Sequence, residues 1–244
     1  MNATVARLTV HTLLGRRRAL LLLVLPAILL VLALVLRLTV GEDSRVDVAV
    51  GLLGAFAVAT LVPLLGLIAG SGAIGPEIED GSIVYLLAKP LSRHSIVVTK
   101  LAVAVGVVTV FAALPVLLAG LVLTGTADGI AVGYGLAALV AGVAYCALFL
   151  LLAVVTRNAV VVGLLYALVW ESLVGSVVPG AQALSVQQWA LALTRAVVGD
   201  AADVYNVTAA VRLAVAVPLL VAVTVASTWL AGSRLRSLRL TGDE

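Results

Sequence analysis

The stretch GPEIEDGSIVYLLAKPLSRHS, residues 75–95, is a polar segment between two long apolar runs. Leu, Val, Ala and Gly dominate the chain on both sides of it. Apolar runs of about twenty residues are long enough to cross a bilayer as helices. The segment therefore predicts a charged connection between two membrane spans. Its charged residues, with the proline among them, are Glu77, Glu79, Asp80, Lys89, Pro90 and Arg93.

The composition of the whole chain agrees with a membrane location. The 244 residues are 63% hydrophobic and 11% charged, and the mean hydropathy is +1.25. A soluble domain usually carries about 25% charged residues. Because backbone polar groups in lipid must be satisfied inside helices or closed barrels, these helix-length runs predict an all-α polytopic membrane protein. We expect one transmembrane domain over residues 1–244.

Six spans are expected, and each of the first three contains a proline. Pro63 in the second span predicts a kink, because proline removes a helix hydrogen bond; Pro26 and Pro115 lie in the first and third spans. The six expected spans cover residues 19–36, 46–74, 96–123, 130–155, 159–178 and 209–231.

Lys and Arg placement predicts the orientation. If the N-terminus is cytoplasmic, eleven of the fifteen basic residues belong to cytoplasmic segments. The remaining four, on the outer side, are Arg37, Arg45, Arg195 and Arg212. Cytoplasmic loops carry the excess of positive charge, so both termini and residues 75–95 are expected in the cytoplasm. The excess of Arg over Lys, with many Ala, Val, Leu and Gly residues, favours a bacterial inner-membrane protein.

Two flanking segments differ from the spans. Residues 1–18 mix apolar residues with arginines, which predicts an interfacial helix on the inner leaflet or, with equal weight, a membrane-proximal cap. Residues 179–208 are expected to form an outer re-entrant or surface segment. Within it, residues 183–197 predict a short amphipathic helix with Trp189 at the interface.

Several kinds of chemistry have no sequence signal. The glycine-rich residues 66–75 lack the lysine of a phosphate-binding loop. The two histidines are far apart, and the single cysteine, Cys146, excludes an intramolecular disulfide. A net charge of +3 does not indicate nucleic-acid binding. The sequence therefore predicts a chain with no ATPase site, no metal site and no nucleic-acid partner.

Glu171 is a carboxylate within the predicted fifth span. A carboxylate deep in a span costs about 2.5–3.5 kcal/mol to insert, so it normally has a partner or a role. One hypothesis is a substrate or proton contact in an outer cavity. The favoured hypothesis is a clamp, in which Glu171 accepts bonds from backbone N–H groups or pairs with Arg195 or Arg212. Separately, Gly66 and Gly70 form a G-x-x-x-G face for close helix contact, within the chain or between subunits.

Residues 75–95 also carry signals for a short helix. Asp80 or Ser82 is suited to cap a helix starting at Gly81, and Pro90 requires that helix to end near Lys89. Ser92 is placed to cap the third span. Two interpretations remain: a charged loop that sets topology, or a cytoplasmic helix that docks a partner. The defined start and stop favour docking.

The segment resembles the signature of ABC-2-type permease subunits. In that family, E-x-E-x-G-[TS]-[LI]-x-x-L-L-x-x-P-[VIL]-S-R, followed by a lysine, comes after the second span. The six-span layout is similar to the small permeases of the group that includes the nitrous-oxide-reductase maturation permease, and residues 170–185 resemble a feature of that group. The residues that match the signature are Glu77, Glu79, Gly81, Ser82, Leu86, Leu87, Pro90, Ser92, Arg93 and Lys100.

The resemblance implies a function and partners. It implies an exporter that works by alternating access, with two permeases, identical or different, and two copies of a cytoplasmic ATP-binding subunit that hold ATP and Mg. The short helix becomes a coupling helix, and an apolar or amphipathic substrate is expected. A non-transporting scaffold or sensor and a secondary transporter remain alternatives. The residues assigned to ATPase coupling are Glu77, Glu79, Asp80, Gly81, Ser82, Tyr85, Leu86, Pro90, Arg93 and Lys100.

Overall fold

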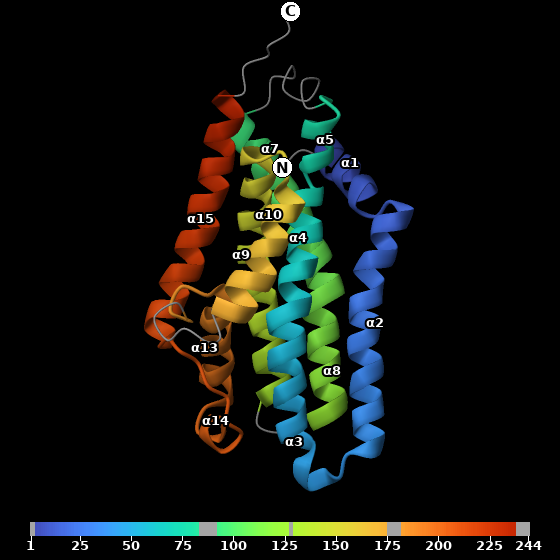
Figure 1. Ribbon diagram of the computed structural model, residues 1–244, viewed down its shortest axis with the longest axis vertical. Coiled ribbons are helices and arrows are strands. Elements are labelled where there is room, and N and C mark those ends of the chain that lie inside the picture. The colour runs from blue at the N-terminus through green and yellow to red at the C-terminus, as the bar shows by residue number, and fades with distance from the viewer. Residues whose placement is uncertain (1–2, 83–91, 127–128, 175–181, 238–244) are drawn as a thin grey trace, which may run out of the picture.

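The computed structural model describes residues 3–82, 92–126, 129–174 and 182–237. Over these ranges the chain is helical and has no strand, and its long helices run side by side as a bundle (Figure 1). The helices are α1 (Ala3–Leu13), α2 (Arg16–Thr39), α3 (Glu42–Gly51), η1 (Leu52–Leu61), α4 (Val62–Gly72), α5 (Gly75–Glu79), α7 (Arg93–Val108), η2 (Thr109–Ala113), α8 (Leu114–Thr124), α9 (Ile130–Val155), α10 (Ala159–Leu165), η4 (Tyr166–Val174), α13 (Val186–Val198), α14 (Ala201–Val204) and α15 (Leu213–Ser237).

Five helices in the described part of the chain are long and apolar enough to cross a membrane. The predicted fifth span is described only as far as Val174, and its apolar part, Ala159–Glu171, is shorter than the others. The all-α membrane fold is thus confirmed. The last span begins later than predicted, at Leu213, because the Ala210 N–H donates to the Gln188 side chain and holds the preceding residues against α13. The five spanning segments are Leu22–Thr39, Glu42–Glu79, Arg93–Thr124, Ile130–Val155 and Leu213–Leu235.

Two spans change helix type just before a proline. The π-helical segments η1 and η2 end two residues before Pro63 and Pro115. Proline has no N–H to donate, and a local π-helical register re-satisfies backbone groups that a proline leaves free in a membrane helix. The kink expected at Pro63 therefore coincides with a change from π to α register.

Helix α9 is the centre of the bundle and contacts α4, α8, α13 and α15. The predicted G-x-x-x-G face of α4 lies against it. A Cβ atom added to Gly66 would lie 2.7 Å from the Cβ of Tyr145, and one added to Gly70 would lie 2.7 Å from the carbonyl oxygen of Cys146. Such distances are too short for carbon atoms, so α4 and α9 approach closely because these residues lack side chains. The face serves contact within the chain.

The N-terminal helix is shorter than expected and packs against the bundle. Helix α1 ends at Leu13, and the next residues turn at Gly15, whose ψ of 140° is not helical. Val5, Thr9 and Leu13, four residues apart and therefore on one face, are buried. Helix α1 contacts α7 and α4. The interfacial helix predicted over residues 1–18 is corrected to Ala3–Leu13, and the arginine cluster begins α2.

The first helix and the end of the last helix lie at the same end of the bundle. Helices α1 and α5 and the last turns of α15 lie at one end, and α3 and α14 lie at the other (Figure 1). Connections at the first end include the predicted coupling segment, whose residues 83–91 fall outside the described ranges.

The glycine contacts predict unequal effects of alanine. Gly70→Ala forces a side chain into α9, and we expect a loss of about 1–3 kcal/mol, the usual range for overpacking. Gly106→Ala is the matched control, since its Cβ would have no atom within 4 Å, and alanine favours the helix by about 0.5–1 kcal/mol. Thermal unfolding in detergent measures both. Equal effects of the two variants would contradict the close α4–α9 contact.

Candidate functional site

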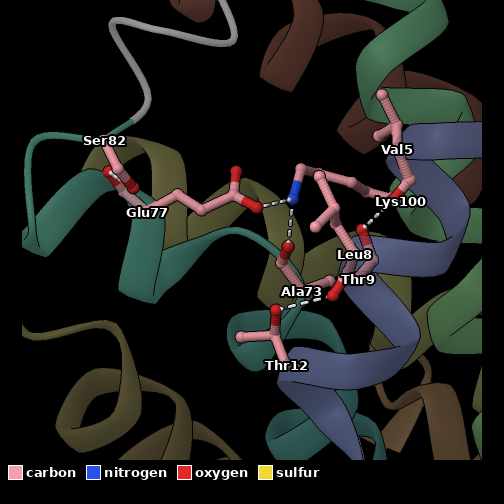
Figure 2. A network of polar contacts seen from close by, with 8 residues as sticks. All are labelled: Val5, Leu8, Thr9, Thr12, Ala73, Glu77, Ser82 and Lys100. Carbon is pink, nitrogen blue, oxygen red and sulfur yellow. Dashed lines mark hydrogen bonds and ion pairs between the residues drawn. The ribbon is translucent and has the colours of Figure 1, made fainter.

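Lys100 is a buried cation near the end of the bundle that carries α5. Its side chain is 0% exposed, and its ammonium group donates to the carbonyl oxygen of Ala73 at 2.6 Å and to Oε1 of Glu77 at 2.7 Å (Figure 2). A buried charge is tolerated only when it is paired and hydrogen-bonded. These two bonds join the end of the second span to α7, the start of the third, across the predicted coupling segment.

Glu77 belongs to the short helix α5, which continues the second span. Its side chain is 21% exposed, and its Oε2 atom has no hydrogen-bond partner among the described residues. Helix α5 ends in a turn at Gly81, whose φ of +69° is in the left-handed region that favours glycine. The Ser82 hydroxyl donates back to the Glu77 carbonyl oxygen at 3.5 Å. Glu77 is thus held at the end of the span by local turn geometry.

Helix α1 covers the ion pair from the side. Helix α1 contacts α7, the helix that carries Lys100, and Figure 2 shows α1 running past the ion pair. The hydroxyls of Thr9 and Thr12 donate to the carbonyl oxygens of Val5 and Leu8, each at 2.8 Å, so they are satisfied within their own helix. The face of α1 near Lys100 is therefore largely apolar. This contact was missed in the sequence, where the spacing of Val5, Thr9 and Leu13 could have indicated a buried face.

The structure brings together some of the predicted coupling residues. Glu77 and Lys100 form the buried pair, whereas Glu79 and Asp80 are exposed at the end of α5. Arg93 begins α7, and the Ser92 hydroxyl accepts the Ser95 N–H at 3.3 Å, which confirms the predicted cap. The described part of the segment contains α5 rather than a helix starting at Gly81. Outside the described residues lie Tyr85, Leu86 and Pro90, with most of the helix predicted from Gly81 to near Lys89.

A hollow opens beside α5 at this end. Its volume is about 680 Å³, and Glu79 and Arg157 line it together with small and apolar residues of α9 and its junction to α10. The hollow therefore offers charges of both signs next to the exposed acids. Among the described residues, no group of three or more His, Cys, Asp or Glu side chains could hold a metal ion.

Glu171 of η4 is the second buried charged residue in the described part of the chain, and its carboxylate lies against the first turn of α13. It is 0% exposed. Its Oε1 accepts from the Tyr166 hydroxyl at 3.0 Å and the Val186 N–H at 3.1 Å. Its Oε2 accepts from the Ser185 hydroxyl at 2.5 Å and the Gln187 N–H at 3.4 Å. The first N–H groups of a helix lack partners within it, and its dipole favours an anion there.

These contacts have the geometry of a backbone clamp between the fifth span and α13. Arg195 is paired with Asp203 at 2.6 Å instead. The sequence did carry a signal for this helix start, since Ser185 and Gln188 have the spacing of a capping box. Ser185 is indeed the cap and accepts the Gln188 N–H at 3.3 Å.

Trp189 is placed differently from its prediction. The amphipathic helix expected over residues 183–197 corresponds to α13, but Trp189 is only 4% exposed. Its indole N–H donates to the Ala183 carbonyl oxygen at 2.8 Å. Helix α13 contacts both α9 and α15, so its apolar face is directed to the bundle, and Trp189 is buried within the protein instead of exposed on the surface of the helix.

Comparison with known protein families gives a match over most of the chain. Residues 3–227 match the profile described as ABC-2 family transporter protein. The chain belongs to the ABC-2 transporter family. It is therefore an integral membrane protein and a permease subunit of an ABC transporter, which agrees with the resemblance carried by residues 77–100. No curated protein matches the chain at a significant level.

The buried pair predicts unequal effects of removing its two partners. Glu77→Ala leaves the fully buried ammonium with one carbonyl, and we expect destabilisation of about 3–5 kcal/mol. Lys100→Met should be milder, because the Glu77 side chain is 21% exposed whereas that of Lys100 is 0% exposed. The double variant should recover part of the loss. Thermal unfolding in detergent tests this, with the exposed Glu79→Ala as control; additive losses in the double variant would refute the pairing.

The clamp at Glu171 makes a separate prediction. Glu171→Gln keeps the size but places an amide donor where four groups already donate, so we expect α13 to loosen. Hydrogen exchange of the Val186 and Gln187 amides should accelerate at least about tenfold, as for the loss of a charged hydrogen bond. Glu42→Gln, whose carboxylate is 90% exposed, is the control. Unchanged exchange in α13 would be incompatible with the clamp.

Proposed function

We propose that this permease is the membrane subunit of an ABC-2-type exporter. Two copies of a separate cytoplasmic ATP-binding subunit would bind ATP and Mg and drive alternating access in a pair of permeases, identical or different. The chain would lie in a bacterial inner membrane with both termini in the cytoplasm. The observation that carries the proposal is the Lys100–Glu77 bond at the two ends of the segment where the family signature lies.

The bond suits transmission of force from a motor subunit. A partner that moves residues 83–91 acts on α5 and α7 at once, because the ion pair and the Ala73 carbonyl hold these helices together. Separating a buried pair by loss of one partner typically costs about 3–5 kcal/mol. The second and third spans therefore move together. The close contact of Gly66 and Gly70 with α9 extends this unit to the fourth span.

The composition of the spans supports an apolar or amphipathic substrate, since Val, Leu, Ala and Gly dominate them. A secondary transporter is less well supported. Such proteins use ionisable groups inside the membrane for coupling. Among the described residues, the buried charged side chains are Lys100 and Glu171, and both are engaged in bonds that hold helices together.

The exposed acids beside α5 predict the site of motor contact. The chain is co-expressed with each candidate ATP-binding subunit of its source organism, and co-purification and ATP hydrolysis are measured. Changing Glu79 and Asp80 together to Lys should weaken subunit binding by about tenfold or more, because like charges across an interface cost several kcal/mol. Changing Glu42 and Asp43 to Lys is the matched control, as an exposed acidic pair at the opposite end.

Three outcomes separate the proposals. If the wild-type chain binds no ATP-binding subunit, the exporter proposal fails. Binding without any effect of the chain on ATP hydrolysis supports the scaffold or sensor. If the Glu79 and Asp80 variant binds and stimulates hydrolysis like the control, these residues do not contact the motor.

A further inference from the structure

A hollow with two arginines lies where α13 meets α15. It has a volume of about 460 Å³. Arg195, in the last turn of α13, and Arg212, immediately before α15, line it, and the other lining residues are small or apolar, among them Ala192 and Leu213. Within the described ranges, no Asp or Glu residue lines the hollow. Two guanidinium groups in a concave, otherwise apolar site suit an anion, because arginine binds phosphate and carboxylate groups through paired N–H donors.

The arginines retain the capacity to bind an anion. Arg195 donates from Nη2 to Oδ1 of Asp203, an exposed pair that leaves its other N–H donors open to a ligand. The exposed Arg212 side chain has no hydrogen bond or ion pair among the described residues. Both arginines also belong to the minority of basic residues outside the predicted cytoplasmic segments. Basic residues on the outer side do not help to set the membrane orientation, so binding of an anionic ligand gives these two arginines a role.

An apolar track leads from this hollow along α15. Leu213, Val217, Val221 and Val225 follow one another at four-residue spacing and are 40–60% exposed. At about 1.5 Å per residue the track from Leu213 to Val225 is about 18 Å long, close to half of a hydrocarbon core of about 30 Å. A second hollow of about 370 Å³ between α9 and α15 lies on this track, lined by Leu139, Val140, Leu220 and Val221 among others.

We propose that α13 and α15 bind an anionic phospholipid of the surrounding bilayer. The headgroup phosphate lies between Arg195 and Arg212, and one acyl chain follows α15 into the hollow between α9 and α15. The combination of a cationic hollow with an apolar track one leaflet long selects a lipid over a free anion. The track is formed by exposed side chains on the outside of the bundle, where bilayer lipid lies. The site is independent of the motor contact proposed above.

Native mass spectrometry of the full-length chain tests the site. The protein is released from nanodiscs of equal parts phosphatidylglycerol and phosphatidylcholine, and the ratio of the two retained lipids is measured. Wild type should retain phosphatidylglycerol preferentially. Changing Arg195 and Arg212 together to Gln should lower that ratio about tenfold, as for the loss of charged hydrogen bonds. Arg37→Gln is the control, since this arginine donates to the Val122 carbonyl oxygen instead.

Two further variants test each half of the site. Val221→Phe fills the apolar hollow and should lower total lipid retention several-fold, whereas Val161→Phe, at a valine of α10 with similar exposure, should not. Asp203→Asn removes the competing carboxylate from Arg195 and should raise the phosphatidylglycerol ratio. Because Asp203 is 77% exposed, this variant retains the fold.

The following results overturn the proposal. The ratio is unchanged or lower in Asp203→Asn, or it falls equally in the Arg37 control. Inorganic phosphate displaces the retained phosphatidylglycerol while Val221→Phe has no effect, which identifies a free-anion site. Val221→Phe and Val161→Phe lower retention to the same extent, which indicates general loss of annular lipid.

Discussion

The bond between the Lys100 ammonium and the Glu77 carboxylate is the interaction on which the end of the bundle depends. In a low-dielectric setting neither charge is stable alone, so the positions of α5 and α7 are coupled through it. The covalent connection between these helices runs through nine residues outside the described ranges. The ion pair is therefore a second, shorter connection between the same two spans, and it holds whatever path the loop takes.

The same physical solution appears at Glu171. There a buried carboxylate joins the fifth span to α13 through the first N–H groups of that helix. Association of helices in lipid gains little from the hydrophobic effect, because lipid tails are as apolar as leucine. Close contact at Gly66 and Gly70 and a few buried charges thus supply specificity that apolar side chains do not. The Lys100–Glu77 pair and Glu171 each lie where a membrane span meets a segment that does not span the membrane.

Hydropathy was sufficient to predict the five long spans, because a bilayer requires long apolar helices whatever their neighbours are. Which helices pack against one another was not predictable from the sequence. The spacing of α1 fits an interfacial helix as well as a buried one, and only its contact with α7 decides. Trp189 was expected at the interface because the pattern of its helix, too, fits an interfacial position as well as a buried one. Glu77 and Lys100 were both assigned to coupling, but the bond between them was not predicted. That bond depends on α5, which continues the second span past Pro76. The sequence signals for a new helix at Gly81 gave no indication of this continuation.

The two ends of the permease differ in what their charges face. At the α5 end, Glu79 and Asp80 are exposed beside a hollow that also holds Arg157, so charges remain open to a protein partner. At the α13 end, the lining charges are arginines above an apolar track, which suits an anionic amphiphile. In both places the open charges belong to helices that are bonded to another segment: the Lys100–Glu77 pair joins α5 to α7, and the Glu171 clamp holds the first turn of α13, whose last turn carries Arg195. A ligand at either end would therefore bind to helices that are bonded to a membrane span.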